Sequence, residues 1–269
     1  MSRISKVFND LPEGEGALVA YVMGGDPDVQ TSAKVLEAVV RGGADIVEVG
    51  IPFSDPIADG KSIQAAGVRA LSAGTTPKDV LGMVSAFRAR SDVPVAVMTY
   101  YNVLYSNGLG RFFDSAEENG VDGVIIPDLP LDEAADCAAM AKARGIDTIL
   151  LAAPTTSPDR MKAIVKHASG FLYLVSLLGV TGARSSLQQG TPALIKFARK
   201  YTKGKVPLGV GFGISEPAHV REVLNSGADA VIVGSGIVDR VSKQSEKGAP
   251  KMFEEVEGYV RSMKSATRG

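Results

Sequence analysis

The sequence has little of the two side chains that most often build cross-links and metal sites: one cysteine and two histidines in 269 residues. The lone cysteine, Cys137, cannot form an internal disulfide, and the helix-like stretch "DEAADCAAMAKA" around it predicts a half-buried thiol. His167 and His219 lie in separate helical patterns, so no cluster of metal ligands is visible. We therefore expect neither a disulfide nor a zinc site.

Long apolar runs and an excess of charge are also missing. No apolar run approaches the roughly 20 residues of a membrane span, and the amino terminus lacks the apolar centre of a signal peptide, which predicts a cytoplasmic protein. The 29 basic and 30 acidic residues leave a formal net charge of −1, and the basic residues are spread along the chain. This pattern disfavours nucleic-acid and anionic-membrane partners and favours a small molecule.

Short apolar runs alternate along the chain with longer stretches of helical periodicity, which predicts parallel strands joined by helices. Eight such units favour an α/β protein of the (β/α)8 TIM-barrel type in a single domain, 1–269, although an open doubly wound sheet remains an alternative. Additional helices are expected at 2–10 and 250–264. The expected strands are 17–23, 45–51, 93–100, 122–128, 147–154, 171–176, 207–213 and 229–235, and the expected helices between them include 28–42, 109–119, 132–144, 158–168, 191–201 and 216–226.

The same short cue precedes several of these strands, namely a turn of small residues followed by aspartate. It reads "GGAD", "NGVD", "RGID" and "SGAD" in turn. The glycine in each can end the preceding helix in a left-handed conformation. The repetition supports the number of units and carries no prediction about chemistry.

Glu48 stands in the second expected strand, where a charge is least tolerated. Because strand side chains alternate, Glu48 shares a face with Ile46 and Gly50, and the apolar opposite face should pack on the helices. Glu48 is thus expected to point into the barrel, where no strand supplies an inward Lys or Arg. Desolvation should raise its pKa toward neutrality, as a general acid or base requires. The alternative is a structural glutamate satisfied by Tyr, Ser or Thr hydroxyls.

The loop after this strand contains two aspartates. Taken alone, Asp55 with Pro56 is most simply a turn, and Asp59 before "GKSIQAAGVRAL" is most simply a helix cap.

The last two expected strands end alike, in "GVGFGIS" at 209–215 and "IVGSGIV" at 232–238. Glycines at the change from strand to helix let backbone N–H groups approach an anion, so the two loops predict a phosphate site. The loop at 176–190, rich in small residues, suits either a lid or an ordinary flexible connection. A Schiff-base aldolase would need a lysine at the carboxyl end of a strand, and none is present.

Taken together, "VEVGIPFSDPIADG", "GVTGAR", "GFGIS" and "VGSGIV" make the chain resemble the tryptophan synthase alpha subunit family over essentially its whole length. The resemblance implies retro-aldol cleavage of indole-3-glycerol phosphate into indole and glyceraldehyde 3-phosphate. It makes Glu48 a proton shuttle, Asp59 the acceptor of the indole N–H and Tyr173 an active-site tyrosine near Glu48. The implied phosphate ligands are Gly182, Gly213, Gly234 and Ser235. The implied indole pocket consists of Tyr21, Ile63, Tyr100, Ile125 and Phe212. Thr181 is implied to contact Asp59 when the loop closes as a lid.

The resemblance also implies partners. Members bind a pyridoxal-phosphate-dependent beta subunit, usually as an α2β2 complex with allosteric activation, and contribute no cofactor of their own. This sequence differs at Lys61, where we expect the family to have proline, and at Leu177-Leu178, before the lid glycine. Two rival hypotheses are a different phosphate-binding barrel, such as a phosphosugar isomerase or a flavin protein, and a scaffolding subunit with a vestigial site.

Overall fold

The computed structural model describes residues 1–176, 190–211, 213–244 and 249–268. Its strands form one parallel sheet with the order β5-β4-β3-β2-β1-β9-β8-β7-β6. The strands are β1 (Ala17–Met23), β2 (Ile46–Gly50), β3 (Val95–Met98), β4 (Gly123–Ile125), β5 (Asp147–Ile149), β6 (Leu151–Ala152), β7 (Leu172–Val175), β8 (Leu208–Gly211) and β9 (Ala230–Val233).

The two ends of this order, β5 and β6, are separated in the chain by Leu150 alone. They are therefore two halves of the fifth predicted strand, one pairing with β4 and the other with β7. The order closes on itself into an eight-membered barrel, as predicted. The open doubly wound sheet is excluded, because such a sheet has two free edges.

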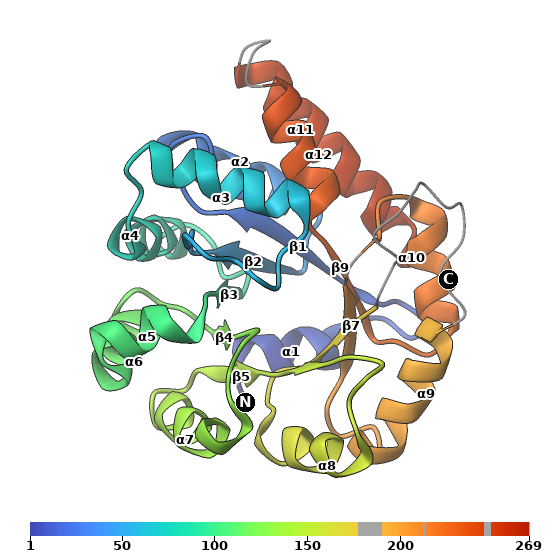
Figure 1. The fold of residues 1–269 in the computed structure, drawn as a ribbon. Coiled ribbons are helices and arrows are strands. Elements are labelled where there is room, and N and C mark those ends of the chain that lie inside the picture. The colour runs from blue at the N-terminus through green and yellow to red at the C-terminus, as the bar shows by residue number, and fades with distance from the viewer. Residues whose placement is uncertain (177–189, 212, 245–248, 269) are drawn as a thin grey trace.

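Helices surround the strands as a ring, with α1 lying inside the ring across one end of the barrel (Figure 1). They are α1 (Arg3–Asp10), α2 (Val29–Arg41), α3 (Lys61–Ser72), α4 (Pro77–Arg88), α5 (Tyr101–Asn107), α6 (Leu109–Glu118), α7 (Ala134–Ala143), α8 (Pro158–His167), α9 (Gly190–Thr202), α10 (Pro217–Asn225), α11 (Ser235–Gln244) and α12 (Ala249–Ser265), with a 3-10 turn at Leu131–Glu133. Both additional terminal helices are confirmed.

The structure also contains α3, α4, α5 and α11, whose bounds were not predicted; of these, α3 is the helix expected after Asp59. Gly67 and Gly82 stand inside α3 and α4, and glycine is a poor helix former. The first turn of α11, "SGIV", continues the apolar run of β9 and therefore resembles a strand. These features weaken the helical pattern, although α4 begins with a capping box between Thr76 and Asp79 and with Pro77 at its first position.

Strand alternation divides the core into two layers. Val47, Val49 and Ile51 belong to the large cluster between the strands and the helices, while Ile46 belongs to the cluster inside the barrel. The predicted faces of β2 are confirmed. At the amino end of the strands, Ile4 of α1 is fully buried in the interior cluster and therefore closes the barrel floor.

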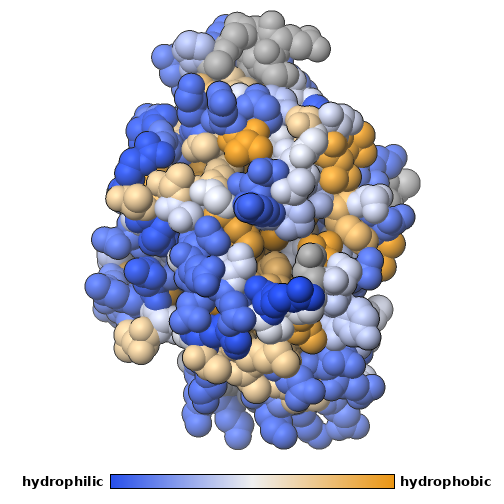
Figure 2. All heavy atoms as spheres, turned by 90° about the vertical axis from the view of Figure 1, so that its left-hand side faces the viewer, coloured by the Kyte–Doolittle hydropathy of each residue, from blue (hydrophilic) through white to orange (hydrophobic). Residues whose placement is uncertain are grey.

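The outer surface of the helix ring is largely hydrophilic on the face drawn in Figure 2, where hydrophobic side chains form separate groups. Cys137, expected to be half-buried, is fully buried on α7, which raises the pKa of its thiol to about 11. None of the helices in the described part of the chain has the length and apolar character needed to cross a membrane. The described residues also contain no group of three or more His, Cys, Asp or Glu side chains placed to hold a metal ion.

Candidate active site

A cavity of about 200 Å³ opens at the carboxyl ends of the barrel strands, which is the end where TIM barrels carry their active sites. Its lining includes nine of the residues predicted from the sequence. They are Tyr21, Glu48, Asp59, Ile63, Ile125, Tyr173, Gly213, Gly234 and Ser235, joined by Ala58, Gly60, Met98, Pro127, Leu151, Ile214 and Ile232.

The remaining predicted residues are placed differently. Tyr100 is not among the residues that line the cavity and instead forms a hydrogen bond with Asp59. Thr181, Gly182 and Phe212 lie outside the described residues.

Glu48 enters the cavity from β2 and is 1% exposed. Among the described residues, its Oε2 has no hydrogen-bond partner, and no Lys or Arg lines the cavity. Burial, with a smaller contribution from the charge of Asp59, raises the pKa of Glu48 from 4.5 to about 8. The side chain is therefore a carboxyl group that can carry a proton near neutral pH.

Two inward glycines make room for the tyrosines beside Glu48. A Cβ at Gly50 would lie 2.1 Å from the hydroxyl oxygen of Tyr21, and one at Gly211 would lie 2.4 Å from that of Tyr173. Real Cβ atoms do not approach so closely, so each ring occupies space that any other residue would fill. β1 and β7 thus supply the two aromatic walls that keep water away from the carboxyl group.

Asp59 reaches the cavity from the loop between β2 and α3. The interpretation of Asp59 as a helix cap is wrong, because the N-cap of α3 is Gly60, which has no side chain to cap with. Burial raises the pKa of Asp59 to about 6, opposed by a hydrogen bond that the Tyr100 hydroxyl donates to its carboxylate. The same hydroxyl accepts the N–H of Ala58 at 3.0 Å. Asp59 is thus held as an acceptor above pH 6.

The part of the cavity wall formed by the loops after β8 and β9 is suited to an anion. Gly234 and Ser235 stand at the amino end of α11, where the first N–H groups have no partner within the helix and the helix dipole favours negative charge. Gly213, in the loop after β8, has a positive φ of 74° that favours glycine. These are the two glycine loops from which the sequence predicted a phosphate site.

The apolar floor was largely missed by the sequence interpretation. Met98, Leu151 and Ile232 line the cavity from β3, β6 and β9. Each follows an inward residue by two positions near the carboxyl end of its strand, so alternation was the signal that could have found them. Together with Ile125 they can hold a flat apolar group.

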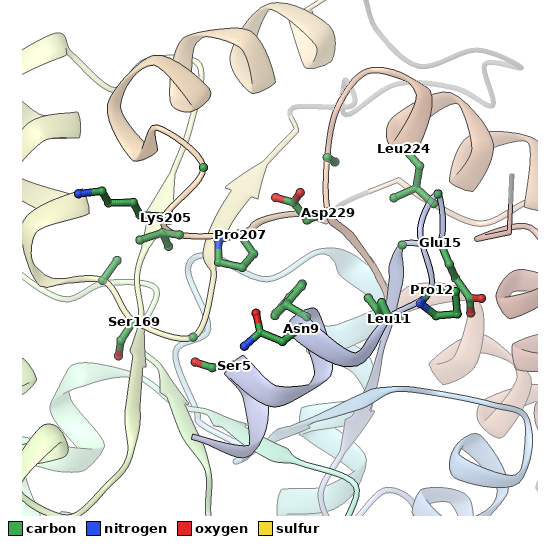
Figure 3. Close-up of a pocket in the computed structure, with 18 residues that line it drawn as sticks. Ser5, Asn9, Leu11, Pro12, Glu15, Ser169, Lys205, Pro207, Leu224 and Asp229 are labelled. Atoms are coloured by element: carbon green, nitrogen blue, oxygen red, sulfur yellow. The ribbon is translucent and has the colours of Figure 1, made fainter. Parts of the chain in front are cut away.

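A larger cavity, about 710 Å³, lies at the other end of the barrel between α1 and the loops before β7, β8 and β9 (Figure 3). None of the predicted site residues lines it. Its acidic groups are already neutralised, because Asp229 pairs with Arg199 and Glu15 pairs with Lys264. Of these two cavities, only the smaller combines carboxyl groups of raised pKa with an apolar floor, and we identify it as the candidate active site.

Comparison with known proteins agrees with this geometry. Residues 8–268 match the family model "Tryptophan synthase alpha chain". The chain is 47% identical to the tryptophan synthase alpha chain of Methanoregula boonei, over 99% of this chain and 98% of that protein. The solved tryptophan synthase alpha subunit of Pyrococcus furiosus is 38% identical with a TM-score of 0.85, over 93% of this chain and 98% of that one.

A chain of tryptophan synthase from M. tuberculosis, solved in an aminoacrylate-bound form, is 32% identical with a TM-score of 0.87, and the match covers 100% of both chains. These matches extend over nearly the full length of the sequence. The chain therefore belongs to the tryptophan synthase alpha chain family.

Proposed function

We propose that the cavity between Glu48, Asp59 and the amino end of α11 is where this lyase cleaves indole-3-glycerol phosphate to indole and glyceraldehyde 3-phosphate. The observation that carries the assignment is the buried Glu48, whose carboxyl group faces the cavity without a cationic partner among the described residues. The cavity divides into an anion-binding end, an acidic wall and an apolar floor, which match the phosphate, the reacting carbons and the indole ring.

Each group has a defined role in the retro-aldol step. The neutral Glu48 donates its proton to indole C3, and its carboxylate then removes the proton from the glycerol hydroxyl next to the bond that breaks. The electron pair of that carbon–carbon bond returns to the indole ring, and the hydroxyl carbon becomes the aldehyde of glyceraldehyde 3-phosphate. Asp59 accepts the indole N–H and stabilises the positive charge that develops on the ring in the transition state.

The other predicted residues bind and enclose the substrate. Gly213, Gly234 and Ser235 hold the phosphate through backbone N–H groups, together with Gly182 from the loop outside the described residues. Tyr173 packs against the reacting carbons beside Glu48. Tyr21, Ile63, Ile125 and Phe212 enclose the indole, Tyr100 supports Asp59, and Thr181 contacts Asp59 when the loop closes.

As a tryptophan synthase alpha chain, the protein passes its indole to a beta subunit. We propose that this partner carries pyridoxal phosphate and that the two assemble as α2β2. The contact should use the loop at 51–59 and its neighbours at the carboxyl end of the barrel. Ile57 in this loop and Tyr105 on α5 are exposed apolar side chains at that end, and an interface would cover them.

Replacing Glu48 with Gln tests the assignment. Glu48→Gln should abolish indole release from indole-3-glycerol phosphate, because the amide cannot carry the proton, while the affinity for an analogue without the glycerol hydroxyls stays within a few fold. Glu118→Gln, on the exposed end of α6, serves as the matched control and should leave turnover unchanged. Retained turnover in Glu48→Gln would refute the proposal.

A further inference from the structure

The loop that carries Asp59 has few attachments to the barrel. Ser54, Asp55 and Ile57 are exposed, so this stretch is not held by burial. The Ala58 N–H is bound by the Tyr100 hydroxyl, and the Phe53 ring stacks on the Tyr100 ring at 5.2 Å between centroids. Tyr100 thus fixes one side of the loop, and the position of Asp59 depends on a second point of attachment.

Gln64, in the first turn of α3, supplies that attachment. Its side-chain Nε2 donates to the backbone carbonyl of Asp59 at 2.9 Å and, at 3.4 Å, to that of Pro56. The N-cap residue Gly60 contributes no side-chain bond, so Gln64 takes over the task of joining the loop to the start of the helix. Gln64 is exposed and does not line the cavity.

The helix that carries Gln64 is itself firmly held. Arg69, later in α3, donates from Nε and Nη2 to the two carboxylate oxygens of Asp26, both at 2.8 Å. Asp26 is only 2% exposed and lies in the loop after β1. Such a paired, two-point bond fixes orientation as well as distance. Ala66 and Ala70 add packing in the cluster that also contains Tyr21.

We propose that Gln64 is a positioning residue for Asp59, holding its main chain while Tyr100 holds its carboxylate. The inference rests on the proposed function, because it assigns Gln64 a share in the work of Asp59. Gln64 binds the backbone carbonyl of Asp59 and Tyr100 binds its carboxylate, so the side chain is held in one orientation, directed at the indole N–H. Catalysis depends steeply on such alignment, since a misplacement of about 1 Å can cost on the order of a hundredfold in rate.

The pH dependence separates this role from a general effect on stability. The ionisable groups that face Asp59 are Glu48 from β2, Tyr21 from β1, Tyr173 from β7 and Tyr100. Of these, Tyr100 lowers the pKa of Asp59 by donating a hydrogen bond. If Asp59 drifts away from Tyr100, its pKa rises, and the acidic limb of activity moves to higher pH.

The test compares variants at position 64. Gln64→Met keeps the length and the helix propensity but removes the donor, and we expect kcat to fall about five- to tenfold with KM within twofold. The acidic limb of the kcat profile should move upward. Gln64→Lys keeps a donor and should retain kcat within about twofold of the wild type. Gln30→Met, at an exposed position in the first turn of α2, is the matched control and should change none of these values.

Asp59→Asn, measured in parallel, separates the two proposals. If Asp59→Asn is inactive and Gln64→Met has the wild-type kcat and pH profile, the positioning role is refuted and the proposed function stands. If Asp59→Asn keeps its activity, the role of Asp59 itself fails. A lower melting temperature of Gln64→Met with an unchanged acidic limb would show a structural role only, and would also overturn the inference.

Discussion

At the scale of single residues, the most consequential feature is a pair of carboxyl groups with separated pKa values. Burial raises the pKa of Glu48 to about 8 and that of Asp59 to about 6. The pKa of Asp59 stays lower because its carboxylate accepts a hydrogen bond from Tyr100. Between these two values Glu48 is neutral and Asp59 is ionised. One group can therefore donate a proton while the other accepts a hydrogen bond.

We therefore predict a bell-shaped profile for kcat/KM in the unbound enzyme, with apparent limbs near pH 6 and pH 8 that belong to the coupled pair. Steady-state indole release from pH 5 to 9 measures it. Rates that keep rising beyond pH 9 would contradict the acid role of Glu48.

The same shift has a consequence for stability. The folded state holds a proton on Glu48 that the unfolded state releases, so the free energy of unfolding falls as pH rises from 4.5 to about 8. Glu48→Gln removes this dependence, and its gain in stability over the wild type should therefore grow through that window. Urea unfolding at pH 5 and pH 8.5 would show it.

The sequence contained the decisive part of this site. Alternation in β2 fixed the inward direction of Glu48, and the absence of Lys and Arg from the strands predicted its desolvation. The hydrogen bond between Tyr100 and Asp59 was not predictable, because it joins the loops after the paired strands β2 and β3, whose conformations the periodic pattern does not specify. Lys61 proved to be the first residue of α3, a position that proline favours, so the difference from the expected family residue leaves the start of the helix intact.

At the scale of elements, the aspartates of the repeated cue extend the strand pairing at the amino end of the barrel. Asp45, Asp122 and Asp229 each donate their N–H to a carbonyl of a neighbouring strand segment. Their carboxylates also accept a backbone N–H from Leu18, Val95 and Leu208, respectively, at 2.6 to 2.8 Å. Each carboxylate also pairs with a cation, and we call this combination of backbone bonds and ion pair a clamp. The cations are Lys264 for Asp45, Arg88 and Arg3 for Asp122, and Arg199 for Asp229.

Removing one clamp should therefore be costly. Asp122→Ala leaves the Val95 N–H and the mostly buried Arg88 without their acceptor, and we expect a loss of about 3–5 kcal/mol in the free energy of unfolding. Chemical denaturation measures this loss. Asp159→Ala, which breaks an exposed pair with Lys162, should change the free energy of unfolding far less. Equal losses in the two variants would contradict the clamp.

The repeat was visible in the sequence, but its chemistry was not. The four letters of each cue indicate a turn, whereas the clamp requires the neighbouring strand at hydrogen-bonding distance. "RGID" shows the limit of the pattern, because Asp147 bonds the Ser2 hydroxyl of the amino-terminal segment. The same local cue thus acquires different partners from its surroundings.

At the scale of the whole molecule, the two ends of the barrel have different tasks. The carboxyl end carries the cavity and its loops, while the amino end is closed by α1 and tied together by ion pairs. Lys264 of α12 reaches both Glu15 and Asp45, at 2.6 and 2.8 Å. Stability and catalysis should therefore respond to separate substitutions.

Ile4→Ala tests this separation. Ile4 is fully buried in the cluster that closes the amino end of the barrel. Its truncation should lower the free energy of unfolding by about 2–5 kcal/mol, with a melting temperature several degrees lower. Indole release at 25 °C should stay within twofold, because the cavity lies at the opposite end. Lys6→Ala, exposed on the same helix, should change neither quantity. A matching loss of turnover in Ile4→Ala would show that the amino end of the barrel and the candidate active site are coupled.

The glycines opposite Tyr21 and Tyr173 restrict how the pocket can be altered over time or by design. Adding even a methyl group at Gly50 or Gly211 collides with a phenol oxygen, so neither position can change before its aromatic neighbour shrinks. Each glycine and its tyrosine must therefore be substituted together, or the tyrosine must be replaced by a smaller residue first. A library that aims to accept bulkier indoles should randomise both members of a pair together.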